Sequence, residues 1–205
     1  MRTVVFITLL ALLGSPLAFA EDSADAGLYY AAEENFDSHS KVELRLGAGQ
    51  DFSNSFLNIY GFSGGALYLI DPKMALGVEG TLYANTRKGS ATSLADEMAR
   101  EGYLMHAVGP QYRTVGVFRI TPISGMVNLF STEIIKVDIS LIARAGGIRY
   151  QVLGWGPTGG LGLETQLGIT PHFGISIAMH YDVEKPASED WLWRAGVAVG
   201  PTFRF

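Results

Sequence analysis

Four side chains near the end of the chain have types and a spacing that could do chemistry. His180, Asp182 and Glu184 alternate, and Ser176 falls in the same alternation. Residues two apart on a strand share a face, so these groups could bind a metal ion or form a nucleophilic site. A serine–histidine site needs both side chains within hydrogen-bond reach. Ser176 and His180 are four residues apart, about 13 Å along a strand. The spacing therefore predicts no catalytic site, and we expect no metal or cofactor site because these acids should pair with basic residues such as Arg194.

Charged residues elsewhere alternate with apolar ones in the same way. We expect this charged row to face the inside of a closed sheet, where opposite charges pair because an unpaired buried charge is very costly. The same inner row would absorb the acids near His180. The predicted lumen charge network consists of Glu43, Arg45, Glu79, Arg113, Lys136, Asp138, Arg144, Glu164, Asp182, Glu184, Arg194 and Arg204.

Eight segments show this period of two, which is typical of half-buried strands. They cover residues 41–49, 56–70, 74–83, 103–120, 135–145, 160–169, 173–184 and 193–205. In the second segment Leu57, Ile59, Leu67 and Leu69 form the apolar row. The fourth is interrupted by Pro110, which predicts a bulge or a break. We expect connections at 121–132 and 151–157, and a short helix at Ser93–Arg100.

The last segment shows which face the apolar row covers. Its apolar row ends in Phe203 and Phe205, and its other row carries Arg194 and Arg204. An exposed aromatic strand end would promote aggregation in a soluble protein, but a barrel in lipid leaves no open edge. Pro201 argues against closure because it cannot donate a ladder hydrogen bond. The predicted fold is all-β, an eight-stranded antiparallel up-and-down transmembrane β-barrel.

The aromatic residues divide between the two ends of the predicted strands. Two such belts are typical of a barrel that crosses both membrane interfaces. The girdle expected at the outer rim consists of Tyr103, Tyr181, Trp191 and Trp193. The girdle expected at the inner rim consists of Phe118, Phe173, Phe203 and Phe205. With the N-terminus in the periplasm, the connections near 87–102, 151–157 and 185–190 would face outward.

The first 20 residues have the features of a secretory signal peptide. Arg2 precedes the apolar run Val4–Leu13, and Ala18-Phe-Ala20 forms a small-x-small cleavage site. We expect residues 21–40 to be a flexible periplasmic lead-in and residues 41–205 to form the barrel. The formal net charge of −5 argues against nucleic-acid binding. The absence of cysteine excludes disulfides and thiolate metal sites.

The chain resembles a family of small outer-membrane β-barrel domain proteins of myxobacteria and related deltaproteobacteria. Ser40–Leu46 resembles the family's opening strand. Thr121–Phe130 resembles its Pro-x-x-Gly-Lys-x-Asn-Leu-Phe connection, with Met126 where lysine is usual, and Val137–Gly147 resembles the next strand. More generally it is similar to OmpA- and OmpX-type eight-stranded barrels. The resemblance implies a Gram-negative outer membrane, and the terminal Phe205 is similar to the signal read by the barrel-assembly machinery.

We therefore expect an outer-membrane barrel with outer-membrane lipid around it, a salt-bridged lumen and no cofactor. Its role would be structural, or would reside in surface interactions of its extracellular loops. One alternative is an outer-membrane lipid-modifying enzyme, although lipid A deacylases carry a serine close to the histidine and His180 is followed by Tyr-Asp. Another is a soluble, secreted, lipocalin-like ligand-binding barrel, which would place its apolar rows inside.

Overall fold

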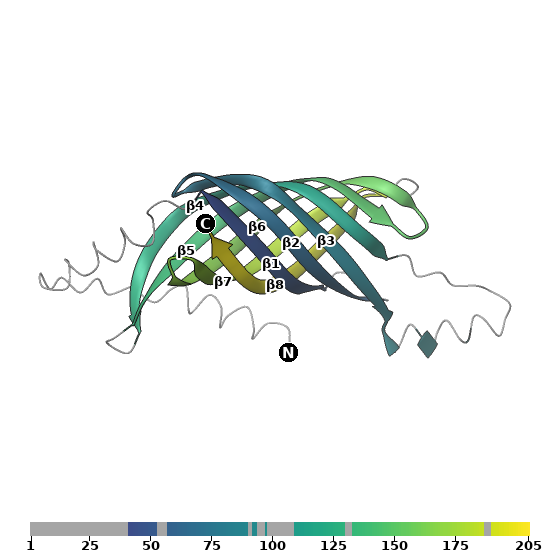
Figure 1. Cartoon of the computed structure of the whole chain (residues 1–205). Coiled ribbons are helices and arrows are strands. Elements are labelled where there is room, and N and C mark those ends of the chain that lie inside the picture. Colours follow the sequence, from purple (N-terminus) through teal and green to yellow (C-terminus); the bar gives the residue numbers. More distant parts are fainter. Residues whose placement is uncertain are drawn as a thin grey trace, which may run out of the picture. The chain divides into compact units, whose positions relative to one another are not determined.

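The computed structural model describes residues 41–52, 57–89, 92–93, 97, 109–129, 133–186 and 190–205. The predicted signal peptide, the predicted lead-in, Tyr103 and most of the expected helix at 93–100 lie outside these residues. Eight strands form one closed antiparallel barrel in which each strand pairs with its sequence neighbours (Figure 1). They are β1 (Val42–Asp51), β2 (Leu57–Asp71), β3 (Met74–Arg87), β4 (Pro110–Leu129), β5 (Glu133–Tyr150), β6 (Gly154–Thr170), β7 (Phe173–Glu184) and β8 (Leu192–Arg204).

The barrel closes where β1 pairs with β8. Glu43 lies opposite Arg204, and Asp51 lies opposite Gly196. Pairing lapses between Arg45 and Ala48 of β1, where the facing strand carries Pro201. Proline has no N–H to donate to the ladder, which accounts for the gap. The objection that Pro201 raised against closure was therefore wrong for the barrel as a whole and right only for these few residues.

The connections are unequal at the two ends of the barrel. The turns after β2 and β6 span only Pro72–Lys73 and Pro171–His172. The chain's last residue lies at this same end, because the backbone N–H of the preceding residue, Arg204, donates to the carbonyl oxygen of His172 at 2.9 Å. We call this the terminus end. The connections after β1, β3, β5 and β7 lie at the other end, which we call the far end.

Two expected connections are wrong in part. Residues 121–129 continue β4, and they pair with β5 as far as Leu129 opposite Glu133. Because the pairing of β4 with β3 stops at Ile120, the β4–β5 hairpin projects past the neighbouring turn (Figure 1). Of the connection expected at 151–157, only residues 151–153 form a turn. Gly154 starts β6 with a φ of 76°, a left-handed conformation that favours glycine.

The apolar row predicted for β2 faces the inside of the barrel, whereas it was expected to face outward. Leu57, Ile59 and Leu67 are buried inside the barrel, and the outer row of β2 carries Tyr60, Phe62 and other apolar residues. Leu67 packs there with four other buried side chains, namely Ala75, Val115, Val117 and Ile142. An eight-stranded barrel is narrow enough to be filled by its own side chains. The interior is therefore part apolar core and part polar network.

Candidate functional site

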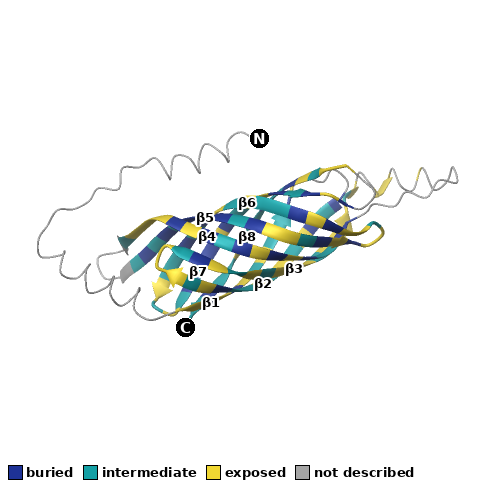
Figure 2. Cartoon of the chain, turned by 90° about the horizontal axis from the view of Figure 1, so that it is seen from above, coloured by how far each residue is buried: buried dark blue, intermediate teal, exposed yellow. Residues whose placement is uncertain are grey.

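The polar interior is built by the alternation of each strand. Figure 2 shows buried and more exposed residues alternating along the ribbons. In β7, for example, Ser176, Ala178 and Asp182 are buried, while Ile177 and Tyr181 are exposed. A period of two on a closed sheet sends one row inward and the other outward. All charged residues of the predicted lumen network belong to the inner row.

The network nearest the terminus end is centred on the fully buried carboxylate of Glu43. Arg119 donates from Nη1 to Oε1 at 2.6 Å and from Nη2 to Oε2 at 3.1 Å. Arg204 donates from Nε to Oε2 at 3.0 Å, and the Nε of Arg45 lies 3.3 Å from Oε1. One carboxylate therefore contacts three guanidinium groups from three strands, and it holds β1, β4 and β8 together inside the barrel.

The charge left over on these arginines is met by neighbouring acids. Arg45 pairs with Glu164, and Arg204 also lies 3.3 Å from Asp138. Gln166 joins them, since its Nε2 donates to the Thr202 hydroxyl at 2.8 Å and its Oε1 accepts from Arg204 at 2.8 Å. We call this set, with Glu43 and Arg119, the terminus-end cluster.

A second network lies toward the far end of the barrel. Arg113 pairs with Asp182 and lies 3.4 Å from Glu79, which is also 3.7 Å from Arg144. Arg194 pairs with Asp51 and lies 3.3 Å from Glu184. Three further side chains belong to this network. The Tyr150 hydroxyl donates to Glu184, and the centroid of the Tyr83 ring lies 4.8 Å from the Arg194 guanidinium. The Nε2 of His180 lies 3.0 Å from Asp51. We call this set the far-end cluster.

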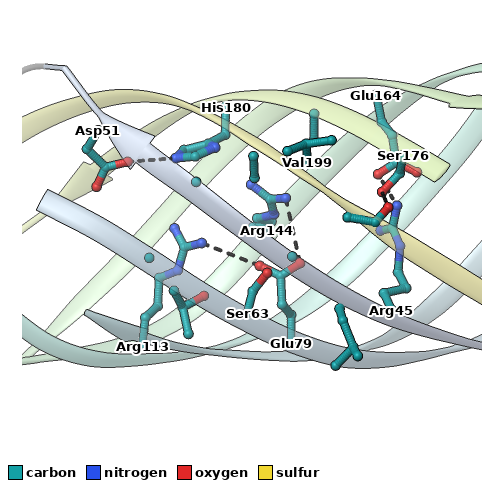
Figure 3. Close-up of a pocket in the computed structure, with 18 of the residues that line it drawn as sticks. Arg45, Asp51, Ser63, Glu79, Arg113, Arg144, Glu164, Ser176, His180 and Val199 are labelled. Carbon is teal, nitrogen blue, oxygen red and sulfur yellow. Dashed lines mark hydrogen bonds and ion pairs between the residues drawn. The ribbon is translucent and has the colours of Figure 1, made fainter. Parts of the chain in front are cut away.

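A small cavity of about 50 Å³ lies between the two clusters. Figure 3 shows Arg45 and Glu164 on one side of it and Asp51, Arg113 and His180 on the other. The remaining wall consists mainly of small residues. A Cβ on Gly49, for example, would lie 2.5 Å from the Val197 carbonyl oxygen, so no side chain fits there. The cavity has room for a few water molecules and no larger ligand.

The structure places all twelve predicted lumen residues in the inner rows, and the ion pairs among the described residues join acids and arginines of this set. Lys136 is buried with them. Sequence reasoning missed Asp51 and Arg119. Both continue the inward alternation of Glu43–Gly49 and of Arg113, so following those rows further along the strands would have found them.

The described aromatic residues predicted at the two rims lie on the outer rows or continue them just past the strand ends. At the far end Tyr181 and Trp193 stack with centroids 5.4 Å apart, and Trp191 is more than half exposed. At the terminus end the ring centroids of Phe173 and Phe203 lie 5.5 Å apart, and Phe205 is exposed. Phe118, also predicted for the inner rim, lies on β4 opposite Ala143.

The residues that first suggested chemistry make other contacts inside the barrel. Ser176 donates to the Gly200 carbonyl oxygen at 3.3 Å, while His180 contacts Asp51. Within the part of the chain that the structure describes, no group of three or more histidine, cysteine or acidic residues could hold a metal ion. In the same residues no helix is long and apolar enough to cross a membrane.

Sequence comparison finds no matching protein family and no matching protein of described function. Among solved structures, Neisserial surface protein A is 14% identical, with a TM-score of 0.42, over 80% of this chain and 96% of its own. A de novo designed transmembrane β-barrel is 13% identical, with a TM-score of 0.41, over 82% and 99%. A second designed barrel, TMB2.3, is 12% identical, with a TM-score of 0.32, over 81% and 94%.

Proposed function

We propose that this chain is an outer-membrane β-barrel protein without enzymatic activity. Its lumen is closed by two salt-bridged clusters, and it acts as a structural or surface-interaction protein through the connections at the far end. The proposal places the terminus end in the periplasm and the far end outside the cell. It rests on one observation, namely where the barrel carries its large apolar side chains.

Large apolar side chains are exposed on every strand of the barrel. They include Leu46, Phe62, Leu82, Ile120, Leu141, Leu161, Ile177 and Val199. Soluble monomers rarely expose apolar patches larger than a few hundred Å², whereas a bilayer stabilises such a belt. A lipocalin-type barrel would carry the apolar rows inside, where this chain holds buried arginines and carboxylates. The surface therefore supports a membrane location.

The location is tested on the native protein by cell fractionation and by cold detergent gels. We expect recovery in the outer-membrane fraction, with an unboiled band that migrates faster than the boiled one because a closed barrel resists detergent. Recovery in the soluble periplasm, with a single mobility, would overturn the proposal. Unfolded protein in inclusion bodies is avoided as a source, since it reports on expression and not on location.

The closed lumen leads to a prediction about conductance. In planar bilayers at neutral pH, we expect the purified barrel to give no steady current, because a hydrated ion would have to displace buried ion pairs at both clusters. A large open porin added to the same membrane serves as the positive control. Regular single-channel steps that scale with the amount of this protein would contradict a closed lumen.

A further inference from the structure

The outer rows of the eight strands carry almost no charge. Among the strand residues whose burial the structure describes, every outward-facing one is uncharged except Arg149, at the far end of β5. Glu133, the first residue of β5, continues the outer alternation of that strand at the terminus end. Lys185 continues the outer row of β7 one residue past its end. Both residues are exposed, and both lie at the far end. The exterior therefore has two cations at one rim, directly above its apolar belt.

Arg149 is held against an aromatic pair. Its guanidinium carbon lies 5.7 Å from the centroid of the Tyr112 ring, and Nη1 donates to the Tyr112 hydroxyl at 3.4 Å. The Tyr112 ring in turn contacts Trp155 edge-on at 4.9 Å. A guanidinium has five N–H donors in a planar fork, and the hydrogen bond to the Tyr112 hydroxyl uses one of those on Arg149. Within the described residues, these contacts position the side chain without neutralising its charge.

Lys185 has a matching arrangement. Its Nζ lies 5.6 Å from the centroid of the Trp191 ring, and its backbone N–H donates to the Pro157 carbonyl oxygen at 3.0 Å. No carboxylate within the described residues pairs with Lys185 or with Arg149. This contrasts with the lumen, where Arg45, Arg113 and Arg194 each pair with an acid.

Only one strand separates the two cations. Arg149 lies opposite Trp155 of β6, and Lys185 follows β7 on the other side of that strand. Below them on β6 and β7 the outer rows continue with Leu161 and Tyr181, which are exposed. A ligand bound there would meet two positive charges at one end and an apolar surface at the other.

We propose that this rim binds a phosphorylated lipid of the outer leaflet. The phosphate group accepts hydrogen bonds from Arg149 and Lys185, and the acyl chains lie along the outer rows of β5–β7. Arginine matches phosphate through paired N–H donors, and basic residues next to a membrane surface favour anionic headgroups. Tyr112 and Trp191 hold the cations at the height of the headgroups, where aromatic belts lie. The inference rests on the membrane location proposed above.

The test uses the full chain in detergent micelles and fluorescent lipid A that either carries or lacks its phosphates. The wild type should bind the phosphorylated probe on the order of 20-fold more tightly, since each cation near a headgroup contributes roughly a factor of five. The double variant R149Q/K185Q should lose this preference. The matched control K41Q/K73Q removes two exposed lysines from the terminus end and should keep the preference within about twofold.

Three results would overturn the inference. They are equal binding of both probes by the wild type, an unchanged preference in R149Q/K185Q, and displacement of the probe by millimolar inorganic phosphate, which would indicate a site for the free ion. Cold-gel mobility shows that each variant is folded. Insertion of the wild type into phosphatidylcholine vesicles tests the membrane location separately. Failure to insert contradicts the proposed function, while insertion without a phosphate preference contradicts only the lipid site.

Discussion

Replacing Glu43 by glutamine should lower the free energy of unfolding by about 3–5 kcal/mol, because removing one partner of a buried ion pair leaves the other charge uncompensated. Glu43 is fully buried and contacts Arg45, Arg119 and Arg204, so the loss affects three guanidinium groups at once. Glutamine keeps the volume of the side chain, removes its charge and replaces one acceptor oxygen by an NH2 donor. Equilibrium unfolding in urea, with the barrel in lipid vesicles, measures the change.

The control for this variant is Asp190→Asn, which removes a carboxylate that is exposed at the far end. It should change stability by less than about 0.5 kcal/mol. Arg119→Gln in the Glu43→Gln background should cost less than Arg119→Gln alone, since the arginine has already lost its closest carboxylate. If Glu43→Gln and Asp190→Asn have the same small effect, the terminus-end cluster does not hold the barrel together.

Replacing Val78 by arginine should destabilise the inserted barrel by about 2–4 kcal/mol, the cost of an arginine that faces lipid near the bilayer midplane. Val78 is 60% exposed on the outer row of β3, between Leu76 and Leu82. In water an arginine at so exposed a position would be nearly neutral. The cost therefore arises only if lipid contacts this face. Unfolding in vesicles measures the change, as for Glu43.

The matched control is Val152→Arg, since Val152 is 68% exposed in the turn between β5 and β6 at the far end. It carries the same substitution at a similar exposure, but in the rim, where the cost should be below about 1 kcal/mol. Equal effects at Val78 and Val152 would show that the two positions face the same solvent, and that the belt does not lie in a membrane.

The number of strands could be predicted from the sequence because a period of two is a local signal. Val42–Ala48 and Phe173–Val183 alternate cleanly, and the structure places both apolar rows outside. The row of β2 could not be assigned in this way. Both of its rows contain apolar residues, and only the packing of Leu67 against residues of β3, β4 and β5 decides which row faces in.

The partners within the charge network also lay beyond the sequence. Glu43 meets Arg119 across 76 positions and Arg204 across 161. Contacts of this kind depend on closure and on the register of several strands at once, and no local pattern encodes them. The length of the β4–β5 hairpin was missed for a related reason. Pro122 and Gly125 suggested a connection, whereas the bulge between Ile120 and Ile123 lets the strand continue past them.

The measurement that tests the lipid-facing exterior most directly is a spin-label scan along β7 in bilayers. The chain has no cysteine, so each introduced cysteine carries the only label. We expect labels at Ile175, Ile177 and Met179 to collide readily with oxygen and rarely with a water-soluble nickel complex, as lipid-exposed sites do. Labels at Ser176 and Ala178 should be shielded from both. Free access of the nickel complex to the first three positions would contradict a membrane-spanning barrel.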